Sequence, residues 1–128
     1  MTAQCEHVAA RAGDLTDRDA VAALVREFDA EPDLAIVHAA GTLDDGVVAG
    51  LDPARLDAVR ASKAGAAWQL HDLTEHRPLA AFVLCSSTAG VLGNPGQAND
   101  AAAHAARDAL AEHRAARGLP ATSIAWGP

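Results

Sequence analysis

Short apolar runs divide this chain, and the segments between them carry apolar residues at helical spacing. The runs at 34–38, 80–85 and 121–126 are bounded by turn-forming residues and have the length of buried strands. A shorter run at 7–12 predicts one more strand before them. The pattern therefore predicts four strands that alternate with helices.

Three segments have the signals of helices. One is expected over 17–29 with Thr16 as its N-cap, and a longer one over 53–75 with Asp52 as its N-cap. A third is expected over 97–117, ahead of a stop signal at Gly118. Helices of this length between strands imply right-handed crossovers, so the predicted fold class is α/β with a mostly parallel sheet.

Candidate binding positions follow the predicted strands, because open parallel sheets bind ligands beyond the carboxyl ends of their strands. Those ends carry Asp14, residues 39–41, and Ser86 with Ser87. Lys63 falls inside the apolar stripe of the 53–75 helix. By itself it has the character of a surface lysine whose stem covers apolar residues. The two serines alone are typical of an ordinary turn.

Composition excludes several classes of function. The formal net charge is −7 and the sequence has no run of Lys or Arg, so we expect no nucleic-acid partner. The longest apolar run is too short to cross a bilayer, and we expect no membrane partner and a cytoplasmic location. Cys5 and Cys85 support neither a disulfide nor a metal site, and no metal is expected. There is no tyrosine, and Lys63 is the only lysine, so mechanisms that need a phenol are excluded.

Five segments occur in order along the chain: GDLTDRDAV, VHAAGTLDDGVV, ASKAGAAWQLHDLT, FVLCSSTAGVLGNPGQAND and GLPATSIAWGP. Together they resemble the catalytic ketoreductase domain of modular type I polyketide synthases, a branch of the short-chain dehydrogenases. The resemblance covers essentially the whole chain, so residues 1–128 are expected to be one truncated domain. It implies a doubly wound Rossmann sheet that is partial, because the first two strands and the glycine-rich turn are missing.

The resemblance also implies a catalytic set of lysine, serine, tyrosine and asparagine. Lys63 and Ser87 match the lysine and the serine. The tyrosine is expected 13 residues after the serine, where this chain has Asp100, and the asparagine 4 residues further on, where it has His104. Two of the four catalytic residues are therefore replaced.

The replacement at position 100 is expected to abolish reduction. The family's tyrosine donates a proton to the ketone oxygen as hydride arrives, which is worth about 10² to 10⁴ in rate. An aspartate carboxyl is ordinarily ionised at neutral pH. Its charge beside the forming oxyanion costs about 4 kcal/mol at about 4 Å and an effective dielectric of about 20. Lys63 further favours the anion, and His104, one helical turn on, is not expected to reach the substrate oxygen.

The cofactor and partners implied by the resemblance are NADPH, an acyl carrier protein and the other domains of a polyketide synthase. Phosphate binding is expected to be lost with the glycine-rich turn, which makes NADPH binding by this chain doubtful. The remaining contacts would be made near the adenine and its ribose, by Asp14, Leu15, Ala39, Ala40 and Gly41.

One segment resembles a stereochemical signature. Leu43, Asp44 and Asp45 match the LDD motif of ketoreductases that give the B-type alcohol, and Leu92 stands where A-type members have tryptophan. Both features indicate B-type ancestry. Epimerase activity, which some reductase-null members keep, stays open.

Two alternatives use other features. The strand at 34–38 would expose a long apolar edge, and the 7–12 strand would have no neighbour, which favours a docking segment that completes a sheet with another chain. Ser87, His104 and Asp100 include the residue types of a hydrolase triad, although no G-x-S-x-G elbow surrounds the serine. Asp100 and His104 are also compatible with solvated positions on an alanine-rich helix.

Overall fold

The computed structural model describes residues 9–127. Three parallel strands form its sheet in the order β1-β2-β3, with bounds Ala35–His38, Ala81–Ser87 and Thr122–Trp126. The register places Val37 opposite Val83, and Cys85 opposite Ile124. This matches the predicted α/β class and the predicted adjacency of the three later strands.

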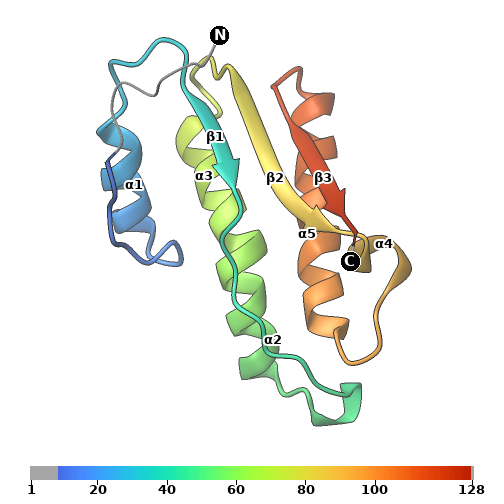
Figure 1. Cartoon of the computed structure of the whole chain (residues 1–128). Helices are drawn as coiled ribbons and strands as arrows, with labels where there is room; N and C mark the ends of the chain where they lie inside the picture. Colours follow the sequence, from blue (N-terminus) through green and yellow to red (C-terminus); the bar gives the residue numbers. More distant parts are fainter. Residues whose placement is uncertain (1–8, 128) are drawn as a thin grey trace, which may run out of the picture.

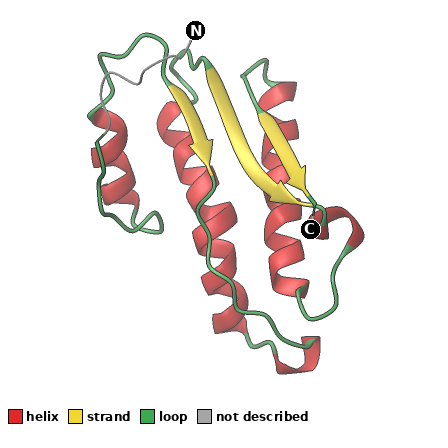
Figure 2. Ribbon diagram, in the orientation of Figure 1, coloured by secondary structure: helices red, strands yellow, loops and turns green. Residues whose placement is uncertain are grey.

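Helices cover one face of the sheet (Figures 1 and 2). A long helical segment consists of α2 (Pro53–Arg60), the π-helical turn η2 (Ala61–Gly65) and α3 (Ala66–Thr74), and α5 (Ala98–Ala116) runs beside it. The short helix α1 (Arg18–Arg26) lies beyond β1. The remaining elements are the 3₁₀ turn η1 (Val48–Gly50) and the one-turn helix α4 (Ala89–Leu92).

The core lies between the sheet and the helices on that face. Strand β2 alternates between buried and half-buried residues, because successive side chains point to opposite faces. Phe82 and Leu84 point to the helices and are almost fully buried. The whole apolar cluster is Val21, Val25, Ala67, Leu70, Leu79, Phe82, Leu84, Leu110 and Ala111.

Helix ends follow local capping chemistry. Asp52 caps α2, since its Oδ1 accepts a hydrogen bond from the Arg55 N–H at 2.9 Å, as predicted. Gly118 has φ of 72° just beyond α5, a left-handed conformation that favours glycine and ends the helix. The cap of α1 was assigned wrongly to Thr16. Asp17 accepts from the N–H groups of Asp19 and Ala20, so the helix begins one residue later.

Other expectations need correction. Residues 7 and 8 lie outside the described residues, and 9–12 form no strand, so no orphan strand is seen in the described chain. Ser86 and Ser87 belong to β2 rather than to a turn. The predicted 17–29 helix is too long, since α1 ends at Arg26 and turns follow, and Phe28 in these turns is 40% exposed.

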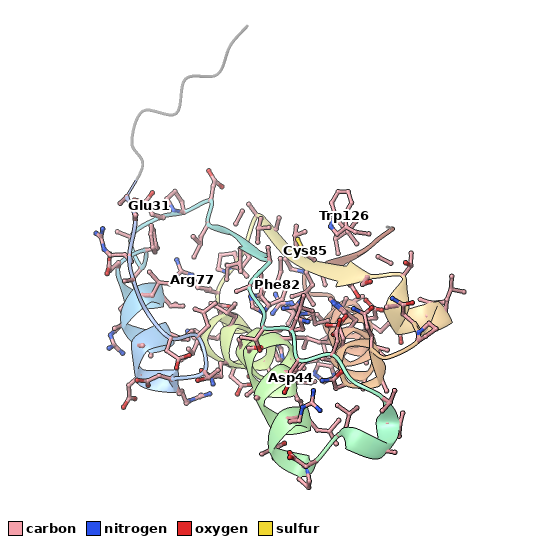
Figure 3. All side chains as sticks on the ribbon, turned by 60° about the horizontal axis from the view of Figure 1, so that its bottom comes forward. Glu31, Asp44, Arg77, Phe82, Cys85 and Trp126 are labelled. Atoms are coloured by element: carbon pink, nitrogen blue, oxygen red, sulfur yellow. The ribbon has the colours of Figure 1, made fainter. Side chains whose placement is uncertain are left out.

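The face of the sheet away from the helices is uncovered in the described part of the chain. Trp126 is 58% exposed there and rises from this face in Figure 3. Val37 on β1 is 66% exposed. Among residues 9–127, no helix is both long and apolar enough to cross a membrane.

Candidate functional site

A buried ion pair joins the two helical segments beneath the sheet. The Lys63 ammonium contacts Asp100 Oδ1, and each residue is only 5% exposed. Lys63 lies in the π-helical turn η2, and Asp100 lies in the first turn of α5. The structure thus brings together two of the predicted site residues and removes both the surface-lysine and the solvated-aspartate interpretations.

The π-helical turn explains how a lysine reaches the interior. A π turn changes the direction of the side chains around it and is often found at functional sites. Ala64 and Lys63 in η2 are both buried, whereas Arg60 just before the turn is exposed. The apolar stripe predicted for the 53–75 helix is therefore interrupted at its centre, where Lys63 makes a polar contact.

His104 lies next to this pair, one turn further along α5. Its Nε2 is 3.6 Å from Asp100 Oδ1, and its Nδ1 is buried without a hydrogen-bond partner. Burial lowers the pKa of His104, and the charges of Lys63 and Arg107 lower it further, against the opposite influence of Asp100. The imidazole is therefore neutral at neutral pH.

Ser87 has hydrogen-bond partners different from those of these three residues. It ends β2, and its Oγ accepts from the Ala89 N–H at 3.1 Å, while the neighbouring Ser86 points to the helices and donates to the His104 carbonyl at 3.4 Å. Ser87 lines a hollow of about 440 Å³ at the end of the sheet. Within residues 9–127 no hydrogen bond connects Ser87 with Lys63, Asp100 or His104, so a hydrolase triad finds no support in the hydrogen-bond pattern.

A second buried cation, Arg107, was missed from the sequence. Its Nη1 donates to the Cys85 carbonyl at 2.7 Å, and its Nη2 donates to the Ala40 carbonyl and lies 3.0 Å from His38 Nε2. It is 1% exposed, and no carboxylate among residues 9–127 lies within ion-pair distance of it. Positions 100, 104 and 107 share one face of a helix, which is the sequence signal that was available.

The segment after β1 packs against this cluster. Gly41 has no room for a side chain, because a Cβ there would stand 2.6 Å from Cε and 2.7 Å from Cγ of Lys63. The Ala40 carbonyl is occupied by Arg107, and Ala39 is exposed. Of the predicted cofactor residues 39–41, Gly41 therefore forms a backbone wall over the Lys63 stem.

Asp14 and Leu15 lie on the opposite side of β1. Asp14 Oδ1 accepts from both the N–H and the hydroxyl of Thr16 at 2.8 Å, and these hydrogen bonds lower the pKa of its exposed carboxyl. Leu15 shares a hollow of about 310 Å³ with residues 34–38 and Leu70. Leu15 is thus at the rim of a hollow bounded by α1 and β1, whereas Asp14 lines a separate hollow of about 270 Å³ beside α1.

The LDD segment is fixed by one arginine of α2. Arg55 forms two hydrogen bonds with the Asp44 carboxylate at 2.9 and 2.5 Å, and it also donates to the Asp45 carbonyl at 2.9 Å. The Asp45 carboxylate accepts from Gln97 at 2.8 Å. Leu43 is largely exposed, and Figure 3 shows Asp44 on the strand-to-helix loop near α2. The segment is therefore an ordered loop between α2 and the start of α5.

Comparisons with known proteins agree on one family. The family model described as KR domain matches residues 1–128. Polyketide synthase GfsB of Streptomyces halstedii is 58% identical over 115 residues, which are 89% of this chain and 2% of the synthase. The NorB protein of the spectinabilin polyketide synthase system of Streptomyces orinoci is 55% identical over 121 residues, which are 94% of this chain and 6% of that protein.

Solved structures give the same picture. The first ketoreductase of the tylosin PKS matches with a TM-score of 0.82 and 52% identity, over 89% of this chain and 25% of that one. A structure of A-type ketoreductases from a modular polyketide synthase matches with a TM-score of 0.85 and 49% identity, over 91% and 25%. The chain thus spans about a quarter of these ketoreductases and a few per cent of the synthases.

Proposed function

The chain belongs to the ketoreductase (KR) domain family of polyketide synthases, within the short-chain dehydrogenases, and from this premise we propose that its own reductase chemistry is lost. Members of the family are NADPH-dependent oxidoreductases. The chain corresponds to part of such a domain, with a partial Rossmann-like fold.

The buried Lys63–Asp100 pair carries the proposal. At the position of the family's tyrosine, the only carboxylate of the cluster stands against an ammonium group in a site shielded from water. A carboxylate engaged with an ammonium group accepts its hydrogen bond, so it cannot replace the phenol as proton donor, and it repels the negative charge that forms on a ketone oxygen. Ser87, the residue aligned with the family's serine, lies at the end of β2.

His104 supports the same conclusion. Its burial and its two cationic neighbours favour the neutral imidazole, so little imidazolium is present at neutral pH to act as an acid. Its Nε2 also faces Asp100 rather than the hollow that Ser87 lines. We therefore assign no proton transfer to His104.

NADPH fits the described residues only in part. Asp14, Leu15 and residues 39–41 would meet the adenosine end, and the ketoreductase chemistry would come from hydride supplied by the nicotinamide. No glycine-rich turn is present in the sequence to hold the phosphates. We propose weak or no NADPH binding by the chain itself, B-type ancestry from Leu43–Asp45, and a cytoplasmic synthase with an acyl carrier protein as the original setting.

The test is reduction by the purified chain. We expect no hydroxyacyl product by mass spectrometry when the chain is incubated with NADPH and a β-ketoacyl thioester, and NADPH-dependent product would overturn the proposal. The matched test uses a longer relative. Introducing aspartate and histidine at the two aligned positions of the first tylosin ketoreductase should lower its rate by about 10² to 10⁴, whereas an unchanged rate would remove Asp100 as the cause.

The uncovered sheet favours a second candidate, a non-catalytic segment that completes a sheet with another polypeptide. Parallel sheets are normally covered on both faces, but here helices cover one face only in the described chain (Figure 1). Val37, Val83, Cys85, Ile124 and Trp126 share the other face by register and alternation. Co-expression with a polypeptide that holds the first strands of a ketoreductase domain should give a stable complex, and failure to co-purify counts against this candidate.

A further inference from the structure

Helix α5 is held in place by two buried arginines that lie seven residues apart on one face. Arg107 contacts His38 of β1, and Arg114 contacts His71 of α3. Arg114 is fully buried, with its guanidinium 3.9 Å above the Phe82 ring and its Nε donating to the Pro120 carbonyl at 3.1 Å. Each arginine therefore faces a histidine in an interior site.

The contact of Arg114 with His71 fixes the protonation state of the histidine. Arg114 Nη1 lies 2.9 Å from His71 Nδ1, and a guanidinium nitrogen can only donate. His71 Nδ1 must therefore carry a lone pair, and the ring proton sits on Nε2, which is directed at Glu75 Oε2 at 3.6 Å. A second proton on this ring would sit on Nδ1. An N–H group of the histidine would then face an N–H group of Arg114, and two positive charges would lie side by side.

The contact of Arg107 with His38 has the same electrostatic consequence. His38 Nε2 lies 3.0 Å from Arg107 Nη2 and 3.0 Å from the Lys63 carbonyl oxygen. Whichever of these two contacts the neutral ring serves, a protonated ring adds a positive charge beside Arg107. Both histidines are 2% exposed, so water cannot screen that repulsion well.

We propose that these two arginine–histidine contacts form an acid-sensitive switch, in which protonation of His71 and His38 releases α5 from α3 and β1. Because α5 carries Asp100 and His104, its release also separates the Lys63–Asp100 pair. The switch concerns this chain's own packing and does not depend on the proposed loss of reductase activity.

The surrounding charges agree with this assignment. Burial lowers the pKa of His71, and Arg114 and His113 lower it further, whereas Glu75 and Asp72 act in the opposite direction. Glu75 is shared with Arg117, whose Nη1 lies 2.6 Å from Glu75 Oε2. Burial likewise lowers the pKa of His38, and the charge of Arg107 lowers it further, whereas the hydrogen bond with the Lys63 carbonyl raises it.

The direction of the pH effect follows from these lowered values. Above the ordinary histidine pKa of about 6.5, both rings are neutral in the folded and unfolded chain, and the contacts are fully stable. As the pH falls below that value, the unfolded chain binds protons that the folded chain does not. Each of the two histidines then raises the ratio of unfolded to folded chain by up to about tenfold between about pH 7.5 and about pH 5.5.

The experiment measures urea unfolding of the full chain across this pH range, with far-UV circular dichroism as the signal. His71→Gln keeps an acceptor for Arg114 but takes up no proton, so the acid-induced rise in the ratio of unfolded to folded chain should be up to about tenfold smaller at about pH 5.5. His38→Gln should likewise remove the part of that rise that is due to His38. His76→Gln at an exposed position is the control and should leave the pH dependence unchanged. An acid dependence equal to that of the parent chain in both buried variants overturns the proposal.

A measurement on the unaltered chain covers the case in which the variants do not fold. Long-range ¹H–¹⁵N spectra of the imidazoles report which ring nitrogen is protonated. We expect His71 as the Nε2–H tautomer, with a pKa below the ordinary histidine value of about 6.5. A proton on His71 Nδ1 at neutral pH, or titration of His71 at or above that ordinary value, contradicts the switch.

Discussion

The buried ammonium and carboxylate of Lys63 and Asp100 depend on each other, since neither has water to replace its partner. Removing one charge from such a pair leaves the other buried and uncompensated, at a cost of about 3 to 5 kcal/mol. We expect Asp100→Asn to lower the free energy of unfolding by this amount in urea titrations. The double variant Lys63→Met with Asp100→Leu should be as stable as the parent chain or more so.

A surface pair supplies the control for this prediction. Asp57 and Arg60 form an exposed ion pair at 3.2 Å, so Asp57→Asn should change stability little. If Asp100→Asn has no more effect than Asp57→Asn, the Lys63–Asp100 contact does not contribute to folding, and the electrostatic argument against catalysis loses its basis.

Gly41 is predicted to be intolerant of even one methyl group. A Cβ there would overlap the Lys63 stem at two carbons, and that stem cannot move freely because its ammonium is paired with Asp100. Gly41→Ala should lower stability by about 1 to 3 kcal/mol, as overpacking does. Gly13→Ala, where no atom lies within 4 Å of the added Cβ, is the matched control in the same thermal unfolding series.

The family pattern predicted that Lys63 and position 100 face one site, but it did not indicate the residues around them. The spacing of the family pattern placed Lys63 and Asp100 together, and the structure brings them into contact. Arg107 and His38 were not found, because a buried arginine without a carboxylate is rare and no motif marks it. Whether Ser87, His104 or the predicted cofactor residues have any role in chemistry stays a prediction.

Among the elements, the loop that carries Asp44 depends on α2. Arg55 binds the Asp44 carboxylate at two points and also the Asp45 and Gly50 carbonyls. A lysine cannot reproduce that planar, two-point contact. We expect Arg55→Lys to speed amide hydrogen exchange over residues 42–50 by about tenfold or more, as loss of a charged hydrogen bond permits.

Arg60→Lys is the comparison for this measurement. Arg60 lies on the same helix and its side chain binds Asp57 at the surface, so the exchange of the 42–50 loop should not change. Equal exchange rates in the two variants would show that the loop is ordered without Arg55, for example by the contact of Gln97 with Asp45.

The elements themselves were largely predictable, and the errors have local causes. Strand and helix positions from apolar periodicity agree with the structure to within a few residues for β1, β2, β3 and α5. The π-helical turn at Ala61–Gly65 was not foreseen, because propensity and periodicity do not distinguish it from an α-helix. The cap of α1 was misplaced by one residue because Thr16 and Asp17 both suit an N-cap.

For the molecule as a whole, the order of the strands followed from the family fold, and so did the exposed edge. Strand β1 pairs with β2 on one side, and no other described strand pairs with it. A free edge with apolar residues can pair with a second chain, and natural proteins block such edges with charged residues, especially lysine. The sequence indicated this edge. It did not indicate the uncovered face, which follows from the placement of the helices on one side of the sheet (Figure 1).

Association through this edge is therefore expected, and one substitution can test it. Val37, 66% exposed on β1, is the natural position for a charge, so Val37→Lys should lower the fraction of associated chain in sedimentation velocity at raised concentration. Val48 is 72% exposed on η1, away from the sheet, and Val48→Lys adds the same charge without touching the edge. A selective effect of Val37→Lys places the contact at β1. An equal effect of both variants means that association does not depend on β1, and the docking interpretation of the open edge then loses its main support.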